Sequence, residues 1–252
     1  MTTRASPAIG ERLLTFSRPL LLKIFNGLNA RCEAHAGGDT RPVFYDIDET
    51  YPSLRTLDRN FAAIKSELNA VLSGIGALPR YHELDHHQDE ISGNDDKNWR
   101  VFMLNVVGKT PRDAATLCPR TVSLLNEIPY VNQAFFSILE PGKSVPAHDG
   151  VYCGYLRYHL GLSIPENDPP ALRVKDKLYT WKEGESILFD DSWNHEVINE
   201  SDDFRIVLLV DVLRPMPKPT ALMNLAWTRG VGHLYSNKVL AKLDDFRLDG
   251  QK

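Results

Sequence analysis

The second half of the sequence is divided into short strand-like runs, and this feature most restricts how the chain can fold. Turn-forming residues separate the runs, and none of them has a helical period. In order they read NQAFFSILEPG, GYLRYHLGLSI, ALRVK, KLYTW, ESILFD, HEVIN and FRIVLLVDVL. Short strands at close spacing indicate a barrel or sandwich rather than alternating strands and helices. We therefore expect a mainly β fold with flanking helices.

The segment before these runs is predicted to be largely helical. In DETYPSLRTLDRNFAAIKSELNAVLSGIG the apolar residues recur every three or four positions, at Leu57, Phe61, Ile64, Leu68 and Val71, and Gly74 stands where a helix would end. The stretch HELDHHQDEISGNDDKNW is so polar that we expect a surface loop. RVFMLNVV then predicts a strand and CPRTVSLLNEIP a short helix.

A chain of 252 residues is of a size that often forms one domain. We expect residues 1–40 to be an N-terminal extension that includes the loop AHAGGDTRP, and residues 41–215 to be the functional domain. Residues 216–252 are predicted to form a tail of one or two helices packed on the same domain.

Charge and cysteine content exclude several classes. The formal net charge is −4 with both signs interspersed, so nucleic acid is not an expected partner. The three cysteines are far apart and in no CxxC motif, which argues against a disulfide framework or structural zinc and favours the cytoplasm. The early run LLTFSRPLLLKIFNGL is too interrupted for a signal peptide or a membrane span, although peripheral membrane contact stays open.

One stretch, VPAHDGVYCGYLRYHLGLSIP, carries unusual polar residues on a predicted strand. Alternation places Tyr155, Arg157 and His159 on one face, while Leu156 and Tyr158 lie on the other. An arginine beside an imidazole suits the lining of a polar cavity. The stretch also raises the question of whether His148 binds a metal.

A second cluster begins two later runs. His195 starts one run and Arg205 starts the next, so an antiparallel hairpin would place them on neighbouring strands. The imidazole could then bind a metal while the guanidinium holds the distal carboxylate of a ligand on that metal, because its planar fork meets both carboxylate oxygens.

With these residues in place, the sequence resembles the aspartyl/asparaginyl β-hydroxylases, a branch of the iron(II)- and 2-oxoglutarate-dependent oxygenases. The matching stretches are FSILEPGKSVPAHDG, LRYHLGLSIP, WKEGESILFDDSWNHEV and FRIVLLVDVLRP, in the family's order and spacing. The resemblance runs from about Tyr45 to Pro215. It implies a double-stranded β-helix, the cupin-type jelly roll.

The resemblance also implies residue roles. It makes His148 and His195 the catalytic iron ligands and places Arg205 on the far carboxylate of 2-oxoglutarate, with O2 as the further co-substrate. The other residues that it places in the co-substrate pocket are Ser137, Arg157 and His159. The family branch has an HxG motif, so Gly150 in place of a carboxylate ligand is expected.

Two points about the metal stay open. Asp149 is not assigned as a ligand, because the neighbour of His148 on an extended backbone points to the opposite face. Whether Asp149 or a water occupies the position of the missing carboxylate is not decided. The histidines of YHELDHHQDE match no ligand geometry, and a solvated or substrate-facing loop is the simpler interpretation.

The substrate is also open. Animal members of the family carry an arginine for the substrate's carboxylate where this chain has Tyr155, which disfavours an acidic peptide and makes Tyr155 a candidate substrate contact. Alternatives are an acyl chain of a lipid A or ornithine lipid type and a natural-product small molecule. The bacterial acyl hydroxylases are expected to carry an HxD motif, which this chain lacks. An alternative of another class is a cupin-fold protein that binds a metal without turnover.

Overall fold

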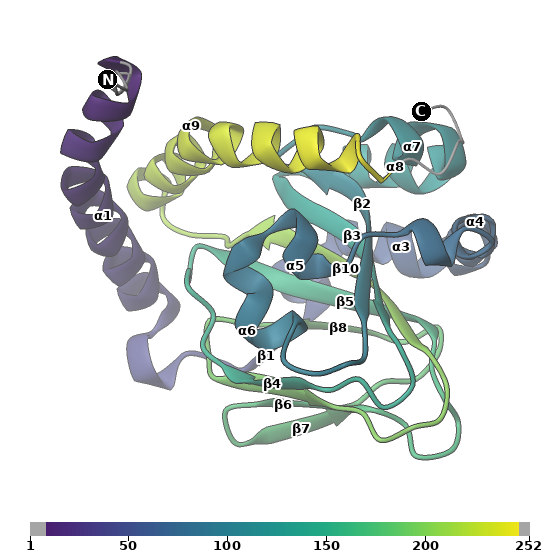
Figure 1. Cartoon of the computed structure of the whole chain (residues 1–252). Coiled ribbons are helices and arrows are strands. Elements are labelled where there is room, and N and C mark those ends of the chain that lie inside the picture. The colour runs from purple at the N-terminus through teal and green to yellow at the C-terminus, as the bar shows by residue number, and fades with distance from the viewer. Residues whose placement is uncertain (1–8, 247–252) are drawn as a thin grey trace, which may run out of the picture.

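The structure is a computed structural model and describes residues 9–246 (Figure 1). Its strands form two antiparallel sheets, a six-stranded sheet ordered β1-β8-β5-β10-β3-β2 and a four-stranded sheet ordered β4-β9-β6-β7. The strands are β1 (Phe44–Tyr45), β2 (Trp99–Val106), β3 (Val131–Leu139), β4 (Val145–His148), β5 (Tyr155–Ser163), β6 (Ala171–Val174), β7 (Lys177–Thr180), β8 (Ser186–Phe189), β9 (His195–Ile198) and β10 (Arg205–Leu213). This is the double-stranded β-helix that the sequence predicts.

The helices lie outside the two sheets (Figure 1). They are α1 (Ile9–Ala36), α2 (Ile47–Thr50), α3 (Arg55–Arg59), α4 (Phe61–Leu72), α5 (Tyr81–Leu84), α6 (Asp89–Ser92), α7 (Arg112–Leu117), α8 (Pro119–Glu127) and α9 (Lys218–Leu243), with the 3-10 turns η1 (Gly38–Thr40), η2 (Pro52–Leu54), η3 (Ile75–Ala77) and η4 (His86–Gln88). Within residues 9–246, no helix has both the length and the apolar composition to cross a membrane.

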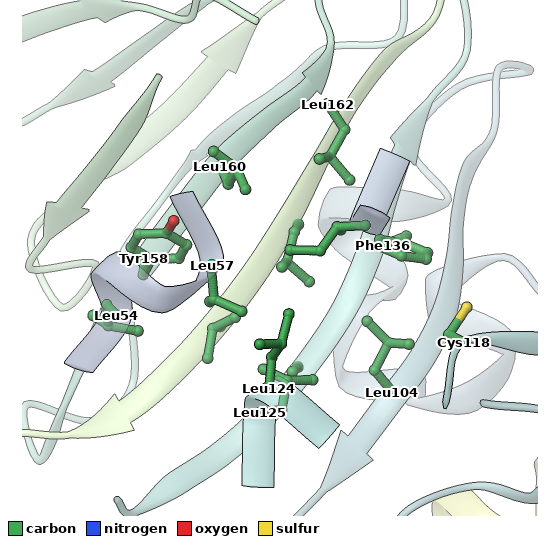
Figure 2. Packing of buried hydrophobic residues seen from close by; sticks show 14 of the residues in the cluster. Leu54, Leu57, Leu104, Cys118, Leu124, Leu125, Phe136, Tyr158, Leu160 and Leu162 are labelled. Atoms are coloured by element: carbon green, nitrogen blue, oxygen red, sulfur yellow. The ribbon is translucent and has the colours of Figure 1, made fainter. Parts of the chain in front are cut away.

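The six-stranded sheet has a different core on each face. On its outer face, Leu54 and Leu57 from η2 and α3 and Leu124 from α8 pack against Phe136 and Leu160 of the sheet (Figure 2). On its inner face, a second cluster faces the four-stranded sheet. That cluster includes Met103, Phe135, Val207 and Leu209 from the large sheet and Leu172, Val174 and Val197 from the small one. The alternation predicted for β5 is confirmed, since Leu156, Tyr158 and Leu160 belong to the outer cluster.

The helix predicted before the sheets is confirmed from Phe61 to Leu72 as α4, but its N-terminal part is divided into η2 and α3. Pro52 begins the separate turn η2, and Asn60, with φ −109° and ψ 19°, separates α3 from α4. The apolar period survives the break, because Leu57, Ile64 and Leu68 still pack into one cluster.

The surface loop predicted from HELDHHQDEISGNDDKNW is also wrong in part, since it contains α5, η4 and α6. Asp85 begins η4 by accepting a hydrogen bond from the backbone N–H of His87. Leu84 and Ile91 pack into the inner core, which fixes this polar segment against the molecule. The predicted loop AHAGGDTRP begins only at Gly37, because α1 continues through Ala36.

The described parts of the predicted extension and tail pack against the molecule. α1 lies against α9, and the tail is one helix, α9, whose Val239 joins the inner core. The outer ends of both segments, residues 1–8 and 247–252, lie outside the described residues. The three cysteines are buried and free, as expected.

Candidate functional site

A cavity of about 250 Å³ lies between the two sheets, and all seven residues singled out from the sequence line it. These are Ser137, His148, Tyr155, Arg157, His159, Arg205 and His195. They come from five strands and from both sheets, so the jelly roll brings together residues that are far apart in the chain.

The two candidate metal ligands face each other across neighbouring strands. His148 ends β4 and His195 begins β9, the two residues are register partners, and their ring centroids are 4.2 Å apart. Each Nδ1 lies 2.8 Å from the carbonyl oxygen two residues earlier, at Pro146 and Trp193. A carbonyl oxygen only accepts, so Nδ1 carries the proton in both rings. Both Nε2 atoms therefore keep a lone pair for a metal.

Burial keeps both imidazoles neutral. Desolvation lowers the pKa of His195 to about 3, with a smaller contribution from the nearby His148. Burial also lowers the pKa of His148. A histidine binds a metal as the neutral imidazole, so the pair is prepared for coordination at neutral pH.

Gly150 is required by the packing of the loop that follows. A Cβ added there would lie 2.2 Å from the carbonyl oxygen of Asp191 and 2.9 Å from the Cα of Ser192. The backbone after β8 therefore occupies the space that a carboxylate side chain would need. Asp149 is exposed, and its carboxylate accepts a hydrogen bond from the side chain of Asn194 at 3.0 Å.

Arg205 is a buried cation that no protein carboxylate pairs with among the described residues. It is 2% exposed, its Nη1 donates to Ser137 Oγ at 3.3 Å, and its guanidinium lies over the Trp181 ring at 4.4 Å. Its Nε has no partner. Burial lowers the pKa of Arg205 to about 9. A buried charge without a partner is costly, so the site is suited to an anionic ligand.

Two more lining residues carry buried polar atoms without hydrogen-bond partners. Both ring nitrogens of His159 are buried and unpaired, between the Trp181 ring at 5.8 Å and the Phe189 ring at 5.0 Å. Burial lowers the pKa of His159 well below its usual value. Asp191 also has one buried oxygen, Oδ1, without a partner.

Arg157 differs from Arg205 because its charge is already paired. Its Nε and Nη2 bind the two oxygens of Asp211 at 2.8 and 2.9 Å, and its Nη1 lies 3.0 Å from Asp191 Oδ2. Tyr155 donates to the same Asp191 oxygen at 3.4 Å. Burial raises the pKa of Asp191 to about 7 even beside Arg157.

Sequence reasoning gave Asp191 and Asp211 no firm role, although both line the cavity. Asp211 could have been found, because it stands at an even spacing from Arg205 on one strand and so shares its face. Asp191 follows β8 at a strand end, where a turn residue is the simplest interpretation, and only the fold places its carboxylate inside the cavity.

The segment predicted to be a solvated or substrate-facing loop reaches the site. Asp85, Gln88 and Ile91 line the cavity. Asp85, His86 and His87 bring donor atoms within 4.8 Å of one another, but both histidines are exposed and His87 Nδ1 is bonded to Asp85 at 2.9 Å. The segment is therefore a wall of the cavity.

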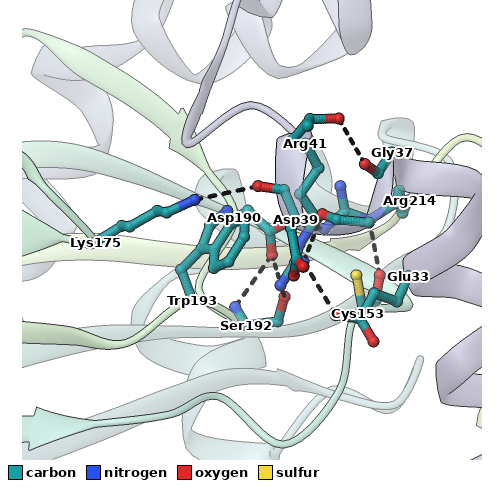
Figure 3. A network of polar contacts seen from close by, with 12 residues as sticks. Glu33, Gly37, Asp39, Arg41, Cys153, Lys175, Asp190, Ser192, Trp193 and Arg214 are labelled. Atoms are coloured by element: carbon teal, nitrogen blue, oxygen red, sulfur yellow. Dashed lines mark hydrogen bonds and ion pairs between the residues drawn. The ribbon is translucent and has the colours of Figure 1, made fainter.

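A polar network holds the loop that carries His195 (Figure 3). Arg41 donates to Asp190 at 2.9 Å and stacks 3.6 Å over the Trp193 ring, and Arg214 pairs with the same Asp190 at 2.8 Å. Trp193 supplies the carbonyl oxygen that fixes His195.

Comparison with known proteins identifies the family. The family model described as aspartyl/asparaginyl beta-hydroxylase matches residues 58–215, a range that contains the seven cavity residues predicted from the sequence. The chain belongs to the aspartyl/asparaginyl β-hydroxylase family. It is 39% identical over 73% of its length to an ornithine lipid ester-linked acyl 2-hydroxylase of Rhizobium tropici, of which 67% is covered. It is 32% identical over 68% of its length to the human aspartyl/asparaginyl beta-hydroxylase.

The match spans only 22% of the human relative, which is a much longer protein. Solved structures of cupin domains also match, including a conserved barrel protein of Salinispora arenicola at 14% identity. Its TM-score is 0.30, and the match covers 51% of this chain and 84% of that one. The family thus rests on sequence, and the jelly roll on the two sheets themselves.

Proposed function

We propose that this protein is an iron(II)- and 2-oxoglutarate-dependent dioxygenase that hydroxylates an unactivated C–H bond, with release of succinate and CO2. One observation carries the proposal. The cavity is lined by two neutral histidines with free Nε2 atoms and by a buried arginine, Arg205, that has no carboxylate partner among the described residues. A metal and an organic anion satisfy both features at once.

The residues fit an iron ion. His148 and His195 would hold it through Nε2, and imidazole is a good ligand for iron. Neither Gly150 nor the exposed Asp149 offers a third protein ligand in this arrangement. The unpaired Oδ1 of Asp191 can accept a hydrogen bond from a metal-bound water, and such outer partners orient the ligands of a metal.

The residues also fit 2-oxoglutarate. Arg205 and Ser137 would bind its distal carboxylate, with the Trp181 ring excluding water from the guanidinium. His159 lies against the same tryptophan and offers a donor and an acceptor to the bound acid. Arg157 holds Asp191 and Asp211 in place, which leaves Arg205 as the free cation.

When bound, iron and 2-oxoglutarate supply an oxidant that can attack an unactivated C–H bond, while the protein supplies orientation and exclusion of water. For the substrate we favour an acyl chain of a polar lipid. The relative from Rhizobium tropici supports this, and Tyr155 stands where a substrate-binding arginine would favour an acidic peptide. A peptide residue is the second candidate, supported by the human relative.

The test is coupled turnover. Purified protein is incubated with iron(II), 2-oxoglutarate and, in separate arms, an ornithine lipid, a lipid A acyl donor, an acidic peptide and a metabolite extract, and oxygen is then admitted. We expect succinate in proportion to a product heavier by one oxygen atom in a lipid arm. His148→Ala and His195→Ala should abolish both; turnover in these variants would refute the site.

Arg205→Ala separates the two bound groups. It should weaken 2-oxoglutarate binding by about 10- to 100-fold, because a charge-assisted contact is lost, and leave iron binding nearly unchanged. Anaerobic calorimetric titrations measure both. Arg100→Ala, which removes an arginine paired with Glu140 outside the cavity, is the matched control. Equal loss of iron and 2-oxoglutarate would contradict the assignment, and metal binding without any succinate would identify a non-catalytic cupin.

A further inference from the structure

Helices α1 and α9 expose large apolar side chains that the fold does not cover. We call these side chains the apolar helix face, and they are Leu20, Leu21, Leu22 and Ile24 of α1 and Leu222 and Met223 of α9. Four of them are about half exposed or more, with Leu222 at 65% and Leu20 at 60%. α1 runs along one side of the molecule, and its N-terminal part extends beyond α9 (Figure 1). The exposed apolar residues form one group on α1 and a second on α9, two helices that pack against each other, and such groups favour an interaction surface.

The charge of this region is opposite to that of the whole chain. α9 contains four Lys or Arg residues and no Asp or Glu, whereas the chain has a net charge of −4. Lys218 and Arg229 are exposed on the half of α9 that carries Leu222, and Lys23 is exposed among the leucines of α1. Exposed apolar side chains beside exposed cations match an anionic bilayer surface, because its acyl region accepts the apolar groups and its headgroups attract the cations.

The apolar helix face is tied to the mouth of the cavity. Phe25 of α1 packs on Tyr152 at 5.3 Å and on Trp227 of α9 at 5.7 Å, and Tyr152 donates to Asn224 of α9 at 2.7 Å. The residue before Tyr152, Val151, lines the cavity and is 75% exposed. Leu21 and Leu22 stand within about one helical turn of Phe25, which is about 5 Å along the axis.

A second hollow adjoins the same helix. It has a volume of about 530 Å³ and is lined mainly by apolar residues, among them Tyr130, Met216, Leu222 and Leu225. An apolar hollow of this size at the start of α9 adds room for hydrocarbon beside Leu222, which lines it.

We propose that the apolar helix face docks on the surface of an anionic bilayer and so holds the cavity mouth against the lipid. The proposal rests on the acyl-chain substrate proposed above, and it names the place from which that substrate is taken. The leucines enter the acyl region, the cations contact anionic headgroups, and Val151 faces the lipid beside the entrance.

The experiment is flotation of the full chain with vesicles, without iron or 2-oxoglutarate. We expect binding to phosphatidylcholine vesicles that contain phosphatidylglycerol, weaker binding to phosphatidylcholine alone, and a loss of the difference as NaCl rises from about 0.1 to about 1 M, where the Debye length falls to about 3 Å. The triple variant Leu21→Gln, Leu22→Gln, Ile24→Gln should bind about tenfold more weakly to both vesicles, because it removes the inserted apolar area.

Matched variants keep the test specific. Leu178→Gln with Ile198→Gln removes two exposed apolar residues from β7 and β9 and should leave binding unchanged. Lys218→Gln with Arg229→Gln keeps every leucine and should weaken binding only to the anionic vesicles. Thermal melts followed by circular dichroism show whether each variant is folded. If the leucine variant is unfolded, the binding of the charge variant tests the proposal.

Three outcomes would overturn the proposal. The first is that the wild type does not float with anionic vesicles, and the second is that the wild type, the α1 variant and the α9 variant float equally. The third is a wild-type dimer in analytical ultracentrifugation that the leucine variant converts to monomer. That result would make the apolar helix face a contact between two copies of the chain. Turnover of a soluble short-chain acyl substrate is measured in parallel. Absent turnover with intact vesicle binding refutes the enzyme proposal alone, and turnover without vesicle binding refutes docking alone.

Discussion

At the scale of single residues, the site is marked by buried polar atoms that the protein leaves unpaired. Most buried polar groups in folded proteins have a hydrogen-bond partner. Here Arg205 Nε, both nitrogens of His159 and Asp191 Oδ1 have none, and all three residues line one cavity with His148 and His195. Each unpaired atom is costly in the ligand-free protein, so together they indicate where an ion and an organic acid would be bound.

Replacing Gly150 by Asp tests whether the missing carboxylate can be restored. The new Cβ would meet the backbone of Asp191, so we expect a loss of about 1–3 kcal/mol in the free energy of unfolding and no gain in iron affinity. Urea unfolding and iron titration measure the two effects. Gly76→Asp, at a position with no atom within 4 Å of the added Cβ, should change stability by less than about 0.5 kcal/mol. Tighter iron binding in Gly150→Asp would show that the loop can move aside.

His159 gives the iron-free protein a pH dependence of known sign. Burial, and then the charge of Arg205, lower the pKa of His159 in the folded state. The stability that it contributes is therefore complete above the unfolded pKa of about 6.5 and is lost as pH falls toward the folded value, because only the unfolded chain takes up the proton.

The variant His159→Phe removes this titration. Between pH 7 and pH 5 we expect the free energy of unfolding of the wild type to fall by about 1–2 kcal/mol more than that of the variant. Urea unfolding without metal measures both. The lowered pKa values of His148 and His195 reduce the stability of both proteins in the same way as pH falls, so the comparison isolates His159. Parallel losses in the two proteins would mean that His159 is solvated.

At the scale of elements, the short loop between β8 and β9 positions His195, the proposed metal ligand, through contacts with distant parts of the chain. Its residues Asp190 and Trp193 are held by Arg41, which lies before β1, and Asp190 is also held by Arg214, which follows β10. Glu33 of α1 binds the same Arg41 at 3.2 Å. Two segments far apart in the chain, residues 33–41 and Arg214, therefore fix the backbone that orients His195.

Arg41→Ala should loosen this loop. We expect about tenfold weaker iron binding and a stability loss of about 1–3 kcal/mol, because one of the two buried cations on Asp190 is removed and an outer support of the proposed ligand is lost. Arg41→Lys should restore part of the iron affinity and part of the stability. Arg55→Ala is the control, since Arg55 also pairs with two carboxylates, Asp48 and Asp58, but not at the site. A loss of stability without a loss of iron affinity would limit Arg41 to a structural role.

At the scale of the whole molecule, α1, α9 and the sheets form one packed unit. Leu28 and Cys32 of α1 cover Tyr152 and Cys153 in a third apolar cluster, and Tyr235 of α9 lines the cavity. The expected division into an extension, a domain and a tail describes the order of segments along the chain. The contacts indicate that these segments depend on one another.

A fragment of residues 41–215 tests this dependence. Without α1 and α9 it exposes the third cluster and opens one wall of the cavity, so we expect a lower urea midpoint and a less cooperative transition than in the full chain. Tryptophan fluorescence and near-ultraviolet circular dichroism follow the unfolding. An unchanged midpoint would show that residues 41–215 are an independent domain.

The sequence by itself determined the fold class and most of the residues that line the cavity. Period-two alternation in β5 and β10 fixes which side chains share a face, because successive residues of a strand point to opposite sides. That rule, with the family resemblance, predicts His148, Arg157, His159, His195 and Arg205 as site residues, and all of them line the cavity.

Only the tertiary structure decided which of these groups are already paired. Arg157 and Arg205 each stand on a strand among apolar residues, so the sequence does not distinguish them. In the structure Arg157 is paired with Asp211 and Asp191, whereas Arg205 has no carboxylate partner among the described residues. The clash behind Gly150, the support from Arg41 and the helical wall at Asp85 also depend on residues distant in the chain. Local pattern carries no information about such long-range contacts, since the packing of the two sheets and helices determines which partners meet.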